Sequence, residues 1–142
     1  MTKNIYFDMD GVLANFHKDF DKAVKGWAMK YSNIRNLEPF ENNLAIVRYL
    51  INKGFNIFIN SAAASESAKQ AKIDWLAEYL PELDDDHIII LVGHTKKVDA
   101  MVTDDGILVD DTKSNINAWR KAGHQAIYLE EKGATVDLAA VA

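Results

Sequence analysis

Two aspartates one residue apart, Asp8 and Asp10, follow a short apolar run and are followed at once by Gly11. Such a run, ended by a glycine turn, is typical of a buried parallel strand that leads into a loop. In open α/β sheets, ligands bind just beyond the carboxyl ends of the strands. Buried like charges repel each other and must be compensated, so the pair predicts a metal or catalytic site at that place. The alternative interpretation, an Asp-Gly turn with a second surface aspartate, involves no chemistry.

Three further apolar runs lead into polar or charged side chains. They are a hydroxyl after the second run, two lysines after the third, and a second pair of acids after the fourth: Ser61, Lys96, Lys97, Asp110 and Asp111. One strand that ends in carboxylates is a weak signal. Two such strands, with a hydroxyl and a lysine at equivalent places on two others, form a specific pattern, because ligand sites in such sheets lie beyond the carboxyl ends of the strands.

Five apolar runs rich in β-branched residues are candidates for the strands that position these side chains: 5–7, 55–59, 87–92, 107–109 and 125–129. Between most of them, apolar residues recur at helical spacing, over 43–53, 65–80 and 114–122. This alternation predicts an α/β fold: a Rossmann-like parallel sheet of about five strands in a three-layer arrangement, with helices on its faces.

Residues 14–39 interrupt the alternation. Phe16, Phe20, Val24 and Trp27 recur at helical spacing there, which predicts one or two helices inserted after the first strand. An aromatic stripe of this kind is usually core. Because this one directly follows Asp10, we also expect the segment to act as a small helical cap over the site. The tail, residues 130–142, shows no strong pattern, and we expect it to be partly mobile.

Composition limits the class of protein. We interpret residues 1–142 as a single domain, long enough to bury a sizeable core. The net charge of −5 and the lack of a basic block argue against duplex nucleic acid as a partner. The absence of cysteine excludes disulfides, thiolate zinc sites and cysteine nucleophiles, and is compatible with the cytoplasm. No apolar run is long enough to span a membrane, and the first strand begins too early to leave room for a signal peptide.

Taken in order, Asp8-x-Asp10-Gly11-Val12, Ser61, Lys97 (or Lys96) and Asp110-Asp111 resemble the four motifs of the haloacid dehalogenase-like (HAD) phosphatase superfamily. The resemblance extends from Asp8 to about Leu129. Within that superfamily, residues 8–16 and 107–111 are similar to the 5'(3')-deoxyribonucleotidase branch, whose members remove phosphate from nucleoside monophosphates. Two features depart from that branch: Ser61-Ala62-Ala63 replaces its threonine-serine-proline run, and the helical insert is shorter.

The resemblance implies a phosphomonoesterase mechanism. In it, Asp8 attacks phosphorus and forms an aspartyl-phosphate, while Asp10 protonates the leaving oxygen and later accepts a proton from the hydrolytic water. Ser61 would bond a phosphoryl oxygen, and Lys97 would neutralise charge on the phosphate and the nucleophile. An acid at position 10 favours phosphate ester chemistry over carbon-halogen cleavage, because an alkoxide leaving group needs a proton.

The resemblance also implies Mg²⁺ as the cofactor, with oxygen ligands from Asp8, the backbone carbonyl of Asp10, and Asp110 or Asp111. The partner would be a small phosphorylated substrate, a nucleoside monophosphate in the best match. Two rival interpretations stay open. One is a phosphatase for another small phosphoester, such as a sugar phosphate, and the other is a non-catalytic module that binds Mg²⁺ or phosphate. A homodimer is compatible with the sequence.

Several residues near these motifs have two interpretations. The family pattern favours Lys97 over Lys96, because the residues after Lys97 predict a helical turn. Phe16 is the first candidate to stack on a substrate base, and Ala62 is expected to contact the substrate together with Ser61 and Lys97. Asn115 either orients the acidic loop or caps the helix that follows it. His94 is interpreted as an incidental loop residue.

Overall fold

The protein is described here by a computed structural model that covers residues 3–93 and 96–141. Its centre is a five-stranded sheet in the order β3-β2-β1-β4-β5, and all four strand pairings are parallel. The strands are β1 (Asn4–Phe7), β2 (Asn56–Ala63), β3 (Ile88–Val92), β4 (Ile107–Asp110) and β5 (Ala126–Tyr128). The predicted α/β class and number of strands are thereby confirmed. From β1 the chain adds β2 and then β3 on one side of the sheet, and it adds β4 and then β5 on the other side. The strand order therefore reverses between β1 and β4. In doubly wound sheets a ligand crevice forms at this point.

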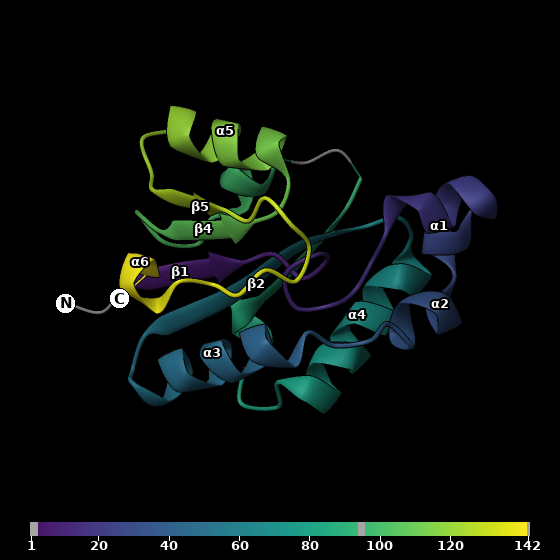
Figure 1. Cartoon of the computed structure of the whole chain (residues 1–142), viewed down its shortest axis with the longest axis horizontal. Helices are drawn as coiled ribbons and strands as arrows, with labels where there is room; N and C mark the ends of the chain where they lie inside the picture. Colours follow the sequence, from purple (N-terminus) through teal and green to yellow (C-terminus); the bar gives the residue numbers. More distant parts are fainter. Residues whose placement is uncertain (1–2, 94–95, 142) are drawn as a thin grey trace.

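Helices cover both faces of the sheet (Figure 1). Helices α3 (Glu41–Asn52) and α4 (Glu66–Tyr79) lie on one face and α5 (Lys113–Lys121) lies on the other. The alternation of side chains along β1 separates two cores. Ile5 and Phe7 belong to the larger cluster with α3 and α4, whereas Tyr6 packs with Phe58 and with Trp119 of α5. The sheet is therefore buried on both faces, as near-continuous apolar strands require.

A helical insert, residues 14–39, joins β1 to α3. It contains α1 (Lys18–Ala23), the 3₁₀ turn η1 (Trp27–Met29) and α2 (Tyr31–Arg35), and it lies beyond the carboxyl end of the sheet (Figure 1). Three contacts hold it to α4 and its N-cap. Tyr31 donates a hydrogen bond to Asp74, Arg35 pairs with Glu78, and the hydroxyl of Ser65 bonds the Met29 carbonyl. These contacts join the insert to the helix that follows β2.

The segment that follows β5, residues 130–141, is called the C-terminal strap. The Gly133 amide donates to the Gly11 carbonyl at 2.9 Å. Asn43 of α3, which is fully buried, donates to the carbonyls of Val12 and Ala134 at 2.9 Å and accepts from the Val136 amide at 3.0 Å. The expectation of a partly mobile tail is wrong for these residues. The strap is ordered by hydrogen bonds to residues in the first third of the chain, and the local sequence of the strap does not reveal these distant partners.

The strap ends in the short helix α6 (Leu138–Val141), whose Val141 is fully buried in the larger core. No helix in the described ranges is both long and apolar enough to cross a bilayer.

A chain of polar side chains crosses the amino ends of four strands. Asn4 of β1 donates to the Asp105 carboxylate at 3.1 Å and accepts from Asn56 of β2 at 2.8 Å. The remaining amide oxygen of Asn56 lies 2.8 Å from one ring nitrogen of His87, and Asp84 lies 2.6 Å from the other. His87 is the last residue of the 3₁₀ turn η2 (Asp85–His87), and its ring also stacks on Phe58. These five side chains are linked to one another by hydrogen bonds.

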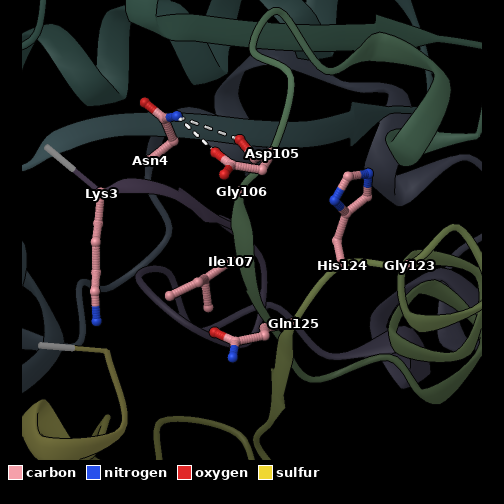
Figure 2. Close-up of a pocket in the computed structure, with 8 residues that line it drawn as sticks. All are labelled: Lys3, Asn4, Asp105, Gly106, Ile107, Gly123, His124 and Gln125. Carbon is pink, nitrogen blue, oxygen red and sulfur yellow. Dashed lines mark hydrogen bonds between the residues drawn. The ribbon is translucent and has the colours of Figure 1, made fainter. Parts of the chain in front are cut away.

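A cavity of about 420 Å³ opens at the same amino end, between the starts of β1, β4 and β5 (Figure 2). Figure 2 shows the Asn4–Asp105 hydrogen bonds at its upper rim, with His124 at the right and Gln125 below. The predicted catalytic residues all lie at the other end of the sheet.

Candidate active site

Four carboxylates gather at the carboxyl ends of the adjacent strands β1 and β4. Asp8 follows β1 directly, and its amide donates to the Val109 carbonyl at 2.9 Å, which continues the pairing of the two strands. Asp110 is the last residue of β4. Carboxylate oxygens of Asp8, Asp110 and Asp111 all lie within 4.8 Å of one another. The parallel register thus brings together two acidic motifs that are about a hundred residues apart in the sequence.

Gly11 allows the loop after β1 to approach Asp111 closely. Its φ is +80°, a conformation that residues with a side chain rarely adopt. A Cβ atom at this position would lie 2.0 Å from an oxygen of Asp111. The loop then folds back on itself, because the amides of Leu13 and Ala14 both donate to the Met9 carbonyl. Gly11 is therefore needed both for the turn and for the close approach of the Asp111 carboxylate.

Lys97 joins the two acidic motifs. Its Nζ lies 2.8 Å from Asp8 Oδ1 and 3.0 Å from Asp110 Oδ2, and the side chain is buried. Lys97 begins the 3₁₀ turn η3 (Lys97–Ala100), and the side-chain amide of Asn60 donates to its carbonyl. Lys96 is exposed. Of the two lysines considered from the sequence, the structure brings Lys97 to the carboxylates.

Burial and crowding change the acid strength of these groups. Burial raises the pKa of Asp8 well above its usual value, the charge of Lys97 opposes this, and the charges of Asp110 and Asp10 add to the increase. Burial disfavours the charged form of Lys97, but the charges of Asp8 and Asp110 outweigh it and raise the Lys97 pKa. Burial and the neighbouring Asp110 also raise the pKa of Asp111. Negative charge is therefore costly in this site.

A second buried cation, which the sequence analysis did not single out, lies on the other side of the site. Lys72 of α4 is 1% exposed, and its Nζ lies 2.8 Å from Asp10 Oδ2, 2.8 Å from Ser61 Oγ and 2.6 Å from the Ala62 carbonyl oxygen. A sequence signal for it exists. Lys72 is four residues after Ala68 and three before Trp75, so it belongs to the buried stripe of α4, where a lysine needs a partner.

Ser61 lies inside β2 rather than beyond it. The predicted strand ended at Ile59, but β2 continues to Ala63 because Ser61, Ala62 and Ala63 pair with Ile90, Leu91 and Val92 of β3. Ser61 is fully buried, and its hydroxyl contacts Lys72. The hydroxyl and Asp10 are thus brought together through a shared cation.

Asn115 orients the second acidic motif. Its side-chain amide donates to Asp110 Oδ2 at 3.1 Å, and the Thr112 amide donates to Asp110 Oδ1 at 2.8 Å. Of the two roles considered from the sequence, the structure therefore shows the contact with the acidic loop. His94 lies outside the described residues.

A cavity of about 260 Å³ lies between the helical insert and the end of β2. Asp10 and Lys72 form its polar side, and the rest is lined by apolar side chains: Phe16, Ala28, Ile34, Ala62, Ala63 and Ala64. The Phe16 ring also packs against Trp27, with ring centroids 6.1 Å apart. Phe16 and Ala62, two of the predicted substrate contacts, therefore face the same space as Asp10.

The donor set at the strand ends suits a hard divalent cation. Asp8, Asp10, Asp110 and Asp111 present four carboxylates, whereas Lys72 and Lys97 supply two ammonium groups. When all are ionised, two negative charges remain uncompensated. Converging carboxylate oxygens of this kind match the ligand preference of Mg²⁺. The residues present therefore fit the ion that the sequence resemblance implies.

Comparison with known proteins supports the fold assignment. No family model matches the sequence, and no curated protein matches it significantly. Among solved structures, the chain is similar to the crystal structure of D,D-heptose 1,7-bisphosphate phosphatase from Burkholderia thailandensis, with a TM-score of 0.58 and 13% sequence identity. The match covers 87% of this chain and 75% of that one. The two proteins share a Rossmann-like α/β fold.

Proposed function

We propose that this chain is a Mg²⁺-dependent phosphomonoesterase of the haloacid dehalogenase-like superfamily that acts through an aspartyl-phosphate on Asp8. One observation carries the proposal. Asp8, Asp10, Ser61, Lys97 and Asp110, which resemble the superfamily motifs in order, lie together at the carboxyl ends of neighbouring strands. The similarity in fold to a known phosphatase supports the same conclusion.

In the first half-reaction, a carboxylate oxygen of Asp8 attacks phosphorus. The bond between phosphorus and the leaving oxygen breaks, and Asp10 gives its proton to that oxygen. Lys97, in contact with Asp8, holds positive charge beside the nucleophile and the incoming phosphoryl group. Ser61 donates its hydroxyl to a phosphoryl oxygen. The product is an aspartyl-phosphate and a free alcohol.

In the second half-reaction, water attacks the phosphorus of the aspartyl-phosphate. Asp10, deprotonated by the first step, accepts a proton from this water, and the acyl-phosphate bond breaks to release orthophosphate and regenerate Asp8. Mg²⁺ would be held by Asp8, Asp110 or Asp111, and the Asp10 carbonyl. When bound, it offsets the repulsion between the carboxylates and the phosphate dianion.

A nucleoside monophosphate is the proposed substrate. The cavity beside Asp10 is lined by Phe16, Ile34 and three consecutive alanines, and it offers an aromatic face but few hydrogen-bonding side chains. Such a lining favours a planar, weakly polar group such as a nucleobase over a sugar covered with hydroxyls, whose hydrogen bonds with water it would not replace.

A sugar phosphate is the second candidate. The structural neighbour is named as a phosphatase of a heptose bisphosphate, and its fold matches most of this chain. Such a substrate would rely on Asp10, at the polar side of the cavity, and on solvent around the insert.

The test is phosphate release from a matched panel: the four deoxynucleoside and four ribonucleoside 5'-monophosphates and a set of sugar phosphates, each with Mg²⁺ and with EDTA. Metal-dependent release concentrated on nucleotides supports the proposal. Release from sugar phosphates alone retains the mechanism and replaces the substrate. If no phosphate is released from any compound although Mg²⁺ still binds, the proposed enzymatic activity is overturned and a binding module is favoured.

A further inference from the structure

We propose that Lys72 is a positioning residue for the reaction: it fixes which oxygen of Asp10 handles the proton and makes the Ser61 hydroxyl a donor toward the phosphoryl group. The inference rests on the proposed phosphomonoesterase activity. It concerns a side chain that is not part of the four motifs and lies on α4, behind the reacting groups.

The contacts of Lys72 use its full hydrogen-bonding capacity. An ammonium group has three N–H donors and no acceptor. Three oxygens surround Nζ: Asp10 Oδ2, Ser61 Oγ and the carbonyl of Ala62, at 2.6 to 2.8 Å. With all three donors engaged and the side chain 1% exposed, none is left for a substrate. Lys72 therefore acts through its neighbours.

The first neighbour is Asp10. Its Oδ2 is held by Lys72, whereas its Oδ1 is buried and has no hydrogen-bond partner among the described residues. A buried carboxylate oxygen without a partner is costly, which points to a ligand or water that completes it. Because Lys72 occupies Oδ2, the proton delivered to the leaving oxygen, and later taken from water, is carried on Oδ1.

The second neighbour is Ser61. Since an ammonium group cannot accept, the serine oxygen must accept from Lys72. The hydroxyl hydrogen is then directed elsewhere, and a phosphoryl oxygen is the acceptor that the proposed reaction brings to this place. The same lysine thus sets the polarity of the phosphate-binding hydroxyl and the orientation of the acid-base group.

The first experiment compares leaving groups. Lys72→Met keeps the length of the side chain and removes its charge and donors. Asp10 matters most when the leaving oxygen is a basic alkoxide and least when it is p-nitrophenolate. We expect kcat/KM to fall about 100-fold for a nucleoside 5'-monophosphate and about tenfold or less for p-nitrophenyl phosphate. Equal losses on both substrates would mean that Lys72 only supports the structure.

The matched controls separate folding from chemistry. Lys69→Met, on the same helix and without a contact to the site, should change either rate by less than about twofold. Asp10→Asn should show the same dependence on leaving group as Lys72→Met, and the double variant should be no slower than Asp10→Asn. If Lys72→Met unfolds in a thermal melt, Lys72→Gln, which retains an uncharged donor, takes its place in the comparison.

The second experiment needs no turnover, so it distinguishes failure of this inference from failure of the proposed function. Orthophosphate binding is measured by calorimetry, with Mg²⁺ present, for wild type, Ser61→Ala, Lys72→Met and the double variant. We expect each single change to weaken binding about fivefold to tenfold and the double variant to be no weaker than the poorer single. Independent, multiplying losses, or no loss in Lys72→Met, would overturn the Ser61 part.

Discussion

The two ends of the sheet are both rich in polar side chains, but they differ in how far these side chains are paired. At the amino end, Asp105, Asn4, Asn56, His87 and Asp84 form one continuous chain of hydrogen bonds across four strands. Each of these side chains has at least one hydrogen-bond partner within the chain of contacts. That arrangement is what polar residues in a stable fold are expected to adopt.

At the carboxyl end, four carboxylates share two buried lysines, and one carboxylate oxygen, Oδ1 of Asp10, is buried without a partner in the described ranges. Burial and mutual repulsion raise the pKa of Asp8. A fold selected for stability alone would not retain such a cluster, so the comparison supports the proposal that this end carries the function. It also predicts that substitutions at the carboxyl end lower the rate, whereas substitutions at the amino end lower stability and leave the rate unchanged.

The largest expected effect is on turnover at the carboxyl end. Asp8→Asn removes the nucleophile, and we expect phosphate release to fall by at least about 1,000-fold. The free energy of unfolding of the metal-free protein should be unchanged or higher, because a buried charge near Asp10 and Asp110 has been removed. Phosphate release and urea denaturation measure the two quantities. Asp105→Asn at the amino end is the control and should retain the full rate.

The second prediction separates two adjacent lysines. Lys97→Met removes the cation that lies between Asp8 and Asp110, and we expect kcat/KM to fall by about 100-fold or more. Stability should fall as well, since two buried carboxylates lose their counter-ion. Lys96→Met is the matched control, because Lys96 is exposed, and steady-state rates of the two variants decide the assignment. A greater loss in Lys96→Met would contradict it.

The third prediction concerns the amino end. Asn56→Ala leaves His87 and Asn4 each without one partner, and the free energy of unfolding should fall by about 1–3 kcal/mol. The rate at saturating substrate should remain within about twofold of wild type. Asn52→Ala, at the exposed end of α3, is the control and should cost less than about 0.5 kcal/mol. A loss of rate in Asn56→Ala would mean that the two ends are not independent.

The smallest expected effect is a pH dependence of the stability that Asp84 contributes. The hydrogen bond from His87 lowers the pKa of Asp84 below its usual value. A depressed pKa in the folded state stabilises the protein above the usual value of about 3.9, and this contribution is lost as the pH falls through the folded-state pKa. The stability advantage of wild type over Asp84→Asn should therefore be smaller at pH 3 than at pH 5. Denaturation curves at both values test this, and a constant difference would contradict it.

Much of this architecture could be predicted from local sequence. The strands were identifiable because buried parallel strands are continuous apolar runs, and the acids at 8, 10, 110 and 111 were identifiable because they directly end such runs. Their meeting follows from the parallel order of the sheet. The extension of β2 to Ala63 could not be predicted, since small residues have little strand preference of their own and are recruited here by pairing with Val92.

Lys72 and the C-terminal strap were missed for a different reason. A lysine within a helix is usually solvated, and only its position on the buried stripe of α4 distinguishes Lys72. The strap has no periodic pattern because its order comes from single polar contacts, chiefly those of Asn43 with Val12 and Ala134. Contacts of this kind depend on tertiary structure, which local periodicity does not encode.

The strap also delays the completion of the contacts around the Gly11 loop during synthesis. Gly133, which bonds Gly11, and Val136, which bonds Asn43, are each made more than 90 residues after their partners. At a translation rate of about 5–20 residues per second, these partners emerge from the ribosome roughly ten seconds after the loop. A nascent chain therefore carries Asp10 and Gly11 before their partners in the strap have been made.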